Sequence, residues 1–311
     1  MDYLTLVAGL AMIVVGAMML TDGSVALAKR LHVPEFIIGL TVMAVGTSMP
    51  EFTVSFISAL KGSGDMAIGN VVGSNIFNIF AILGICALFS PISFTRSNIR
   101  RDIPLCIVAT LAMVGVTALN EDITRLEGLL LALGYVVMIG LTIRADRRKM
   151  EMGEITSEVE GGDMPSWRIA VWIIVGLVGL IYGGQLCVDS ASAIARDLGV
   201  SEATIAITLV AGGTSLPELA SSLMAIFRGS PSLALGNVLG SNIANILLIL
   251  GVCGVVTPLT MSGVEMTDIY VALAAALAVM IAAMVIGRDK ITRAEGFMFL
   301  VCYAAYVYTL I

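Results

Sequence analysis

Long runs of apolar residues alternate with short polar segments along the whole chain. A helix needs about 20 apolar residues to cross the roughly 30 Å hydrocarbon core of a bilayer. The pattern therefore predicts an all-α polytopic membrane protein with ten transmembrane helices. The expected spans lie near residues 3–20, 34–60, 66–90, 103–119, 124–143, 169–195, 202–227, 232–257, 268–287 and 294–310.

Composition and the placement of charge agree with this pattern. The chain is 58% hydrophobic and 13% charged, whereas charged residues make up about a quarter of a soluble domain. If the ten spans are correct, only Lys61, Arg125 and Arg196 of the 17 basic residues fall in loops that follow even-numbered spans. Because basic loops stay in the cytoplasm, we expect a multi-pass protein of the cell membrane with both termini outside.

An internal repeat divides the chain into two related halves. Residues 35–84 align with residues 202–251 without a gap, at a constant offset of 167, and half of the positions are identical. Each half has five predicted spans, and an odd number forces the second half into the opposite orientation. The sequence thus predicts two inverted five-helix repeats, 1–143 and 169–311, joined by a cytoplasmic loop at 144–168. Inverted repeats are typical of transporters, with a substrate site near the midplane.

The repeated residues include two carboxylates inside apolar spans. The first block contains GTSMPE, ending in Pro50 and Glu51, and the second contains GTSLPE, ending in Pro217 and Glu218. Proline removes a helical hydrogen bond and displaces the carbonyl four residues earlier, which frees backbone oxygens. A charge at the bilayer centre costs at least about 2.5 kcal/mol, and no Lys or Arg is placed within a span to offset it. The missing positive charge must come from bound cations or protons.

The oxygen ligands around these glutamates indicate which cations fit. Carboxylates, hydroxyls and carbonyls are the ligands of Ca²⁺ and Na⁺, and the blocks offer nothing soft to zinc or copper. Two carboxylates would neutralise one Ca²⁺ or hold about two Na⁺. A shared site that takes either ion, but not both, is the physical basis of exchange.

A second polar pattern follows each glutamate block. Polar residues recur at intervals of four and so lie along one helix face. The two triplets are Asn70, Ser74 and Asn78 in the first half and Asn237, Ser241 and Asn245 in the second. We expect their side chains to bind the ions or to support the carboxylates. Asp22 and Asp189, near the ends of the first and sixth spans, are weaker candidates for a role in ion access.

With GTSxPE followed by GNxxGSN in both halves, the chain resembles the calcium/cation antiporter superfamily, specifically its prokaryotic sodium/calcium exchangers. The resemblance implies that spans 2, 3, 7 and 8 surround four cation positions, while spans 1 and 6 slide across them to alternate access. It further implies that Glu51 and Glu218 bind both ions together with the backbone carbonyls of Thr47 and Thr214. The other implied ligands are the carbonyls of Ala44 and Ala211 and the side chains of Ser48, Ser74, Asn78, Ser215, Ser241 and Asn245.

Na⁺/Ca²⁺ antiport is therefore the expected function, and H⁺-coupled cation antiport on the same fold is the alternative. Many relatives have Asp at the position of Asn245, so the two carboxylates here disfavour potassium dependence. A channel would usually need a symmetric ring of subunits. Enzymatic activity is not expected, because His32, the single histidine, lies in a loop and leaves no Ser–His pair. We expect Ca²⁺, Na⁺ and lipid as partners, a functional monomer, and neither a cofactor nor nucleic acid.

Overall fold

The computed structural model describes residues 2–120, 122–152, 164–198, 211–261, 264–286 and 289–310. The helices of the first half are α1 (Asp2–Leu31), α2 (Glu35–Ile38), α3 (Ala44–Thr47), α4 (Met49–Leu60), α5 (Gly64–Ile76), α6 (Gly84–Phe89), α7 (Ile103–Asn120) and α8 (Arg125–Glu151). Those of the second half are α9 (Ser166–Asp197), α11 (Ala211–Gly213), α12 (Leu216–Phe227), α13 (Pro231–Ile243), α14 (Gly251–Val256), α15 (Met266–Ile281) and α16 (Arg293–Thr309). Within the described residues, five π-helical segments adjoin them: η1 (Gly39–Met43), η2 (Phe77–Leu83), η3 (Asn98–Asp102), η5 (Ala244–Leu250) and η6 (Ala282–Ile286).

Two short antiparallel ribbons connect the halves at the ends of the helices. Strand β1 (Ile92–Ser93) pairs with β4 (Lys290–Ile291), and β2 (Asp122–Ile123) pairs with β3 (Leu259–Thr260). Each ribbon therefore joins a strand of the first half to a strand of the second. The ribbons hold the helix ends in register across the two halves.

The helices have the length and surface of a membrane protein. Within the described ranges, seven helices are long and apolar enough to cross a bilayer, or eight if the bent pair 35–60 is one span. Large apolar side chains on α8 face outward, including Leu129, Leu133 and Val136. A surface of this kind suits lipid rather than water. The number of ten spans and the inverted arrangement of the repeats stay predictions.

Helix boundaries differ from the sequence expectation at several points. α1 continues to Leu31, well past the predicted end at residue 20, and α8 continues to Glu151. The start of the predicted loop 144–168 is therefore helical, because its Arg and Lys residues are good helix formers and do not end a helix. Residues 153–163 of that loop and residues 202–210 of the predicted seventh span lie outside the described residues.

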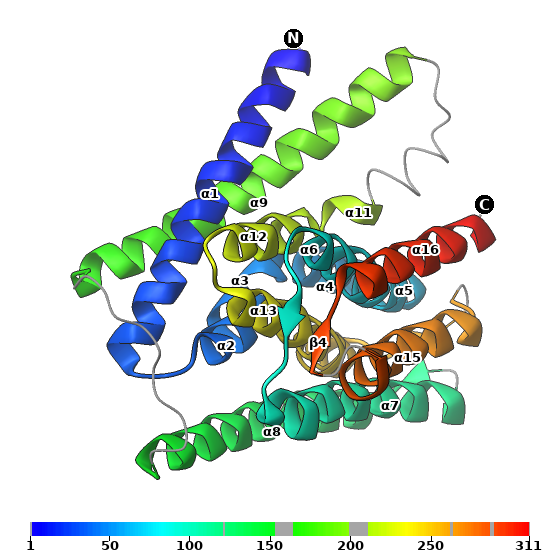
Figure 1. The fold of residues 1–311 in the computed structure, drawn as a ribbon. Helices are drawn as coiled ribbons and strands as arrows, with labels where there is room; N and C mark the ends of the chain where they lie inside the picture. The colour runs from blue at the N-terminus through cyan, green and yellow to red at the C-terminus, as the bar shows by residue number, and fades with distance from the viewer. Residues whose placement is uncertain are drawn as a thin grey trace.

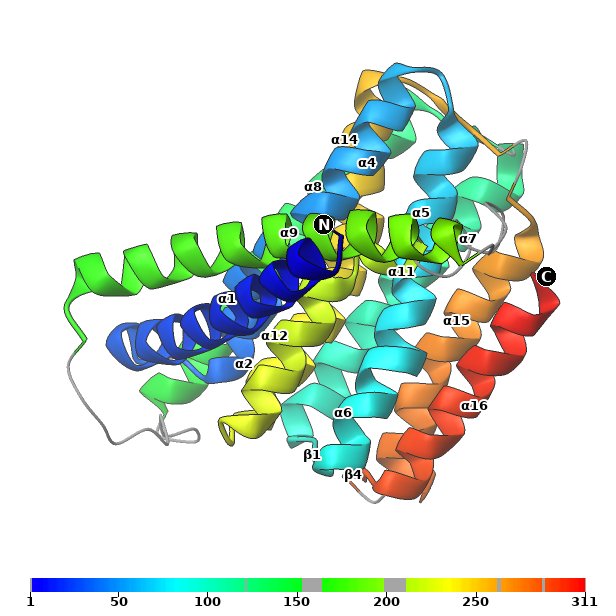
Figure 2. The same ribbon diagram turned by 90° about the horizontal axis from the view of Figure 1, so that it is seen from above.

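α1 and α9 form a separate pair that crosses the other helices obliquely (Figures 1 and 2). Small residues line their contact. A Cβ atom placed on Gly16 would lie 2.8 Å from the carbonyl oxygen of Gly176, and one placed on Gly176 would lie 2.6 Å from the backbone nitrogen of Leu20. Glycine is needed at this crossing because the two backbones touch, as is common between membrane helices.

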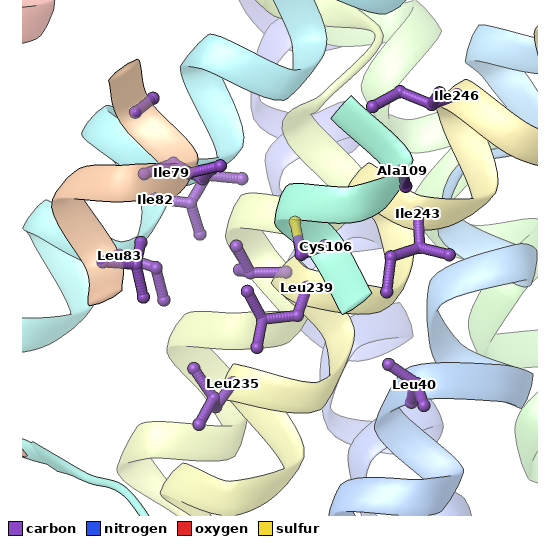
Figure 3. Packing of buried hydrophobic residues seen from close by; sticks show 14 of the residues in the cluster. Leu40, Ile79, Ile82, Leu83, Cys106, Ala109, Leu235, Leu239, Ile243 and Ile246 are labelled. Carbon is purple, nitrogen blue, oxygen red and sulfur yellow. The ribbon is translucent and has the colours of Figure 1, made fainter. Parts of the chain in front are cut away.

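The two helices that carry the GNxxGSN motifs form the core. In the apolar stretches of the segments Gly64–Phe89 and Pro231–Val256, 78% and 83% of the stretch are buried, whereas only 17% of the apolar stretch of α8 is buried. Figure 3 shows Leu235, Leu239 and Ile243 of α13 among side chains from neighbouring helices, including Leu40 and Cys106. The motif helices are thus shielded from lipid by the helices around them.

Candidate cation-binding site

A break in the helix precedes each glutamate. α3 ends at Thr47, and Ser48 interrupts the helix with φ −80° and ψ 9°. The helical parts on either side of Ser48 are bent by 47°. Ser215 has nearly the same backbone conformation, with φ −91° and ψ 8°, just before α12. The bends occur next to the prolines, as the sequence predicts.

The prolines and glutamates occupy the first turns of the helices that follow these breaks. Pro50 and Pro217 lie at the start of α4 and α12, where the N–H that proline lacks has no helical partner to lose. Glu51 and Glu218 come one residue later and are completely buried. The positive end of a helix dipole favours a negative charge at this position. The breaks therefore also supply part of the electrostatic support for the carboxylates.

Each carboxylate accepts a hydrogen bond from the serine of the opposite half. Ser48 Oγ donates to Glu218 Oε1 at 2.9 Å, and Ser215 Oγ donates to Glu51 Oε1 at 2.7 Å. Ser74 Oγ also donates to Glu51 Oε1, at 3.5 Å. These contacts bring residues 164 to 170 positions apart into one cluster. The cluster therefore contains both repeated blocks.

The first asparagine of each GNxxGSN motif supports the backbone beside its glutamate. The amide of Asn70 donates to the carbonyl oxygen of Glu51 at 3.2 Å and to Ser55 Oγ at 2.9 Å. The amide of Asn237 donates to Ser222 Oγ at 2.9 Å and to the carbonyl oxygen of the second glutamate at 3.5 Å. These two asparagines are therefore positioned as supports rather than as exposed ligands.

The carbonyl of Ala44 also faces the cluster. It accepts the hydroxyl of Ser241 from the opposite half at 3.5 Å, the hydroxyl of Thr47 at 3.4 Å, and the N–H of Ser48 at 3.1 Å. The helical hydrogen bond of this carbonyl is thus retained, and the bend does not unwind it fully. Ala211, the implied counterpart, is the first residue of α11.

Five buried oxygens of the cluster accept no hydrogen bond from the described residues. They are Glu51 Oε2, Glu218 Oε2, Asn78 Oδ1, Asn245 Oδ1 and Thr214 Oγ1. In the same part of the chain, no Lys or Arg forms an ion pair with either glutamate. Leaving a buried acceptor without a partner costs about 1–3 kcal/mol, and more when it is charged. A set of five such oxygens is a site that hard cations would satisfy.

Glu51, Glu218 and the serines that contact them belong to the GTSxPE and GNxxGSN motifs. The sequence matches the family described as sodium/calcium exchanger protein over residues 1–144 and 168–311. This chain belongs to the sodium/calcium exchanger family.

Two curated relatives match almost the full length of this chain. The putative antiporter CaxA of Alkalimonas amylolytica is 37% identical over 307 residues, which cover 97% of this chain and 96% of that protein. The sodium/calcium exchanger MaX1 of Methanosarcina acetivorans is 30% identical over 351 residues, covering 99% of this chain and 98% of that one.

The fold is shared with solved exchanger structures. A structure of the sodium-calcium exchanger NCX_Mj superposes with a TM-score of 0.86 at 30% identity, covering 100% of this chain and 99% of that one. The structural match confirms a membrane exchanger fold. It agrees with the resemblance that the motifs indicate.

Some residues of the exchanger site were missed at the level of the sequence. Asn75 and Asn242 are the last letters of the two GSN motifs, and both are buried and hydrogen-bonded across the halves. Ser55 and Ser222 accept the amides described above. The identity between the halves marks all four as candidates, because Asn75 aligns with Asn242 and Ser55 aligns with Ser222 at the offset of 167. Only the packing shows which groups they contact.

An apolar cavity of about 220 Å³ lies beside the exchanger site but does not contain the carboxylates. Its lining includes Val45, Phe52 and Leu248, and Ser48 is the polar residue on its wall. Apolar walls offer a cation no ligands. The oxygen cluster, and not this cavity, is therefore the candidate cation site.

Proposed function

We propose that this protein is a secondary active antiporter that exchanges Na⁺ for Ca²⁺ by alternating access. The cation site is built on Glu51 and Glu218 and lies between two inverted five-helix repeats. The observation that carries the proposal is the set of five buried oxygens without a donor, two of which belong to the carboxylates. Membership of the sodium/calcium exchanger family supports the choice of ions.

Charge balance explains why one site would serve both ions. Two carboxylates would balance one Ca²⁺, whose usual six to eight oxygen ligands can be drawn from the glutamates, Asn78, Asn245 and backbone carbonyls. Na⁺ would use the same carboxylates together with the hydroxyls of Ser74 and Ser241. Because both ions need the same carboxylates, binding of one displaces the other. That competition couples the two fluxes.

The proposed site also bears on the assembly of the protein. The proposed ligand set is complete within one chain: Ala44, Thr47, Ser48, Glu51, Ser74, Asn78, Ala211, Thr214, Ser215, Glu218, Ser241 and Asn245. A monomer is therefore sufficient for exchange. By the distribution of basic residues, we place the protein in the cell membrane with both termini outside and the loop 144–168 in the cytoplasm.

The test is Ca²⁺ uptake into proteoliposomes that contain the purified protein. Vesicles loaded with Na⁺ are compared with vesicles loaded with K⁺, and with vesicles under an imposed pH gradient in buffer without Na⁺. The proposal predicts uptake only with internal Na⁺. Uptake that the pH gradient drives alone would keep the site but reassign the coupling ion to H⁺, and uptake that needs neither gradient would contradict antiport.

A further inference from the structure

Four asparagine amides meet where α5 and α13 cross. The amide nitrogen of Asn75 donates to the backbone carbonyl of Asn242 at 3.2 Å, and the amide nitrogen of Asn242 donates to the backbone carbonyl of Asn75 at 3.2 Å. Both side chains are at least 97% buried, with exposed fractions of 3% and 2%. This exchange fixes which end of each amide carries the nitrogen.

The oxygens of the same two amides then accept a second pair of hydrogen bonds. Asn245 Nδ2 donates to Asn75 Oδ1 at 3.0 Å, and Asn78 Nδ2 donates to Asn242 Oδ1 at 3.0 Å. Each bond crosses from one half of the chain to the other. If the amide of Asn75 or Asn242 were turned over, oxygen would face carbonyl oxygen and nitrogen would face nitrogen. Both ends of these amides are therefore fixed.

The consequence appears at the far end of Asn78 and Asn245. Because their nitrogens are held by Asn242 and Asn75, their Oδ1 atoms are left over, and these are two of the buried oxygens that no described residue donates to. Asn78 lies one turn beyond Ser74, whose hydroxyl contacts the Glu51 carboxylate. Asn245 lies one turn beyond Ser241, whose hydroxyl donates to the Ala44 carbonyl of the cluster. Both free oxygens therefore lie one turn from residues of the cation cluster.

An amide gives no steric reason to present oxygen rather than nitrogen. The two ends are nearly the same size, so only hydrogen bonds decide between them. A nitrogen turned toward a cation would direct its N–H dipoles at a positive charge and supply no ligand. The binding of Ca²⁺ or Na⁺ by Asn78 and Asn245 thus requires that something fixes their orientation.

We propose that Asn75 and Asn242 are positioning residues, each of which orients the ligand asparagine of the opposite half so that its oxygen faces the transported cation. The inference rests on the proposed function. Asn242 orients Asn78, and Asn75 orients Asn245. Asn75 and Asn242 themselves would not bind the ion, because the nitrogen and the oxygen of each side chain already form hydrogen bonds within the protein.

A purely structural role is the competing explanation, since amides between membrane helices also hold the helices together. A variant that only weakens helix packing would affect Ca²⁺ binding equally whatever stands at position 78 or 245. The positioning role makes the effect depend on that residue. An Asp at position 78 presents oxygen in either orientation, so it no longer needs Asn242.

The experiment measures the Kd for radiolabelled Ca²⁺ of the purified full-length protein by equilibrium binding, in three backgrounds. In the wild-type background, Asn242→Ala raises the Kd roughly tenfold, because the amide of Asn78 loses the buried hydrogen bond that turns its oxygen toward the cation. In the Asn78→Asp background, Asn242→Ala raises the Kd by less than about twofold, because a carboxylate needs no donor to fix it and Asn242 Oδ1 would otherwise face one of its oxygens. In the Asn245→Asp background, the matched control, the tenfold penalty returns, because Asn75 and not Asn242 orients position 245.

The mirror set provides an independent second test. Asn75→Ala is measured in the wild-type, Asn245→Asp and Asn78→Asp backgrounds, and the penalty disappears only with Asn245→Asp. Equal penalties in all three backgrounds of either set would overturn the positioning role. Normal Ca²⁺ binding without Na⁺-driven uptake would instead contradict the proposed exchange and leave the positioning role standing, so the two failures are distinguishable.

Discussion

The central helices and the α1–α9 pair are held in place by different interactions. Around Glu51 and Glu218, hydroxyls and amides of one half donate to oxygens of the other. Between α1 and α9, glycines bring two backbones into direct contact, and the hydroxyls of Thr5 and Ser190 share one hydrogen bond of 2.8 Å. Only 33% and 28% of the apolar stretches of these helices are buried.

In the proposed exchange cycle, this difference separates the part that would bind the ions from the part that would move. Directional hydrogen bonds fix positions to a few tenths of an ångström, as ion selection requires. Contacts between small residues are less directional, because they depend on shape alone. α9 also passes over both helix breaks: a Cβ atom on Gly46 would lie 2.6 Å from Leu177, and one on Gly213 would lie 2.3 Å from Val188. Under the proposed alternating access, movement of α1 and α9 would cover or uncover the candidate site.

The largest expected effect comes from removing one central charge. Glu51→Gln or Glu218→Gln should lower the rate of Na⁺-dependent Ca²⁺ uptake at least about 100-fold, because breaking a buried ion pair costs about 3–5 kcal/mol. The thermal unfolding temperature in detergent should not fall, since a neutral amide is easier to bury. Uptake at the wild-type rate in either variant would exclude that glutamate from the site.

Glu295→Gln is the matched control for this change. Glu295 is also buried, but it closes the first turn of α16 by accepting the N–H of Thr292 at 2.6 Å. A glutamine oxygen can accept the same bond. Uptake should therefore remain within about twofold of wild type.

A wedge between α1 and α9 should act on movement rather than on recognition. In Gly16→Val, the new Cβ would lie 2.8 Å from the carbonyl oxygen of Gly176 in α9. Overpacking of this kind destabilises a packed helix pair by about 1–3 kcal/mol. We expect the uptake rate to fall about tenfold or more, with the equilibrium Kd for Ca²⁺ unchanged. Gly134→Val on α8 is the control, because a Cβ there meets no atom within 4 Å. A raised Kd in Gly16→Val would mean that the pair takes part in recognition.

The smallest effect is expected from the ion pair that links α1 to the end of α12. Arg228 contacts Asp22 at 2.9 Å, and both side chains are partly exposed. Exposed pairs contribute about 0–1 kcal/mol, so Arg228→Ala should change the uptake rate by less than about threefold. A larger loss would show that the position of α1 depends on this exposed polar contact with the end of α12.

The sequence predicts which side chains gather in the polar cluster better than it predicts the helices around them. Glu51 and Glu218 stand out because a carboxylate beside proline in an apolar run has no packing explanation, and the repeat then assigns each its counterpart. The change to π geometry at Phe77 and Ala244 is not predictable, because the spacing from Asn70 to Asn78 reads as a continuous helical face. π segments are frequent at functional sites.

The periodic pattern of polar residues also does not predict the contacts between the two halves. The sequence places Asn75 and Asn242 in the GSN motif of their own halves. Only the packing of α5 against α13 shows that each amide donates a hydrogen bond to the opposite half. Span counting has a similar limit. α16 has 17 residues and α12 has 12, so the length of these helices alone does not establish ten spans.

The most direct test of the central claim, one shared site for two ions, is competition at equilibrium. Binding of radiolabelled Ca²⁺ to the purified protein is measured over a range of Na⁺ concentrations, with K⁺ as the control salt. The account predicts that Na⁺ raises the apparent Kd for Ca²⁺ more steeply than in proportion to its concentration, without lowering the number of sites, and that K⁺ has no such effect. Ca²⁺ binding that Na⁺ leaves unchanged would contradict it.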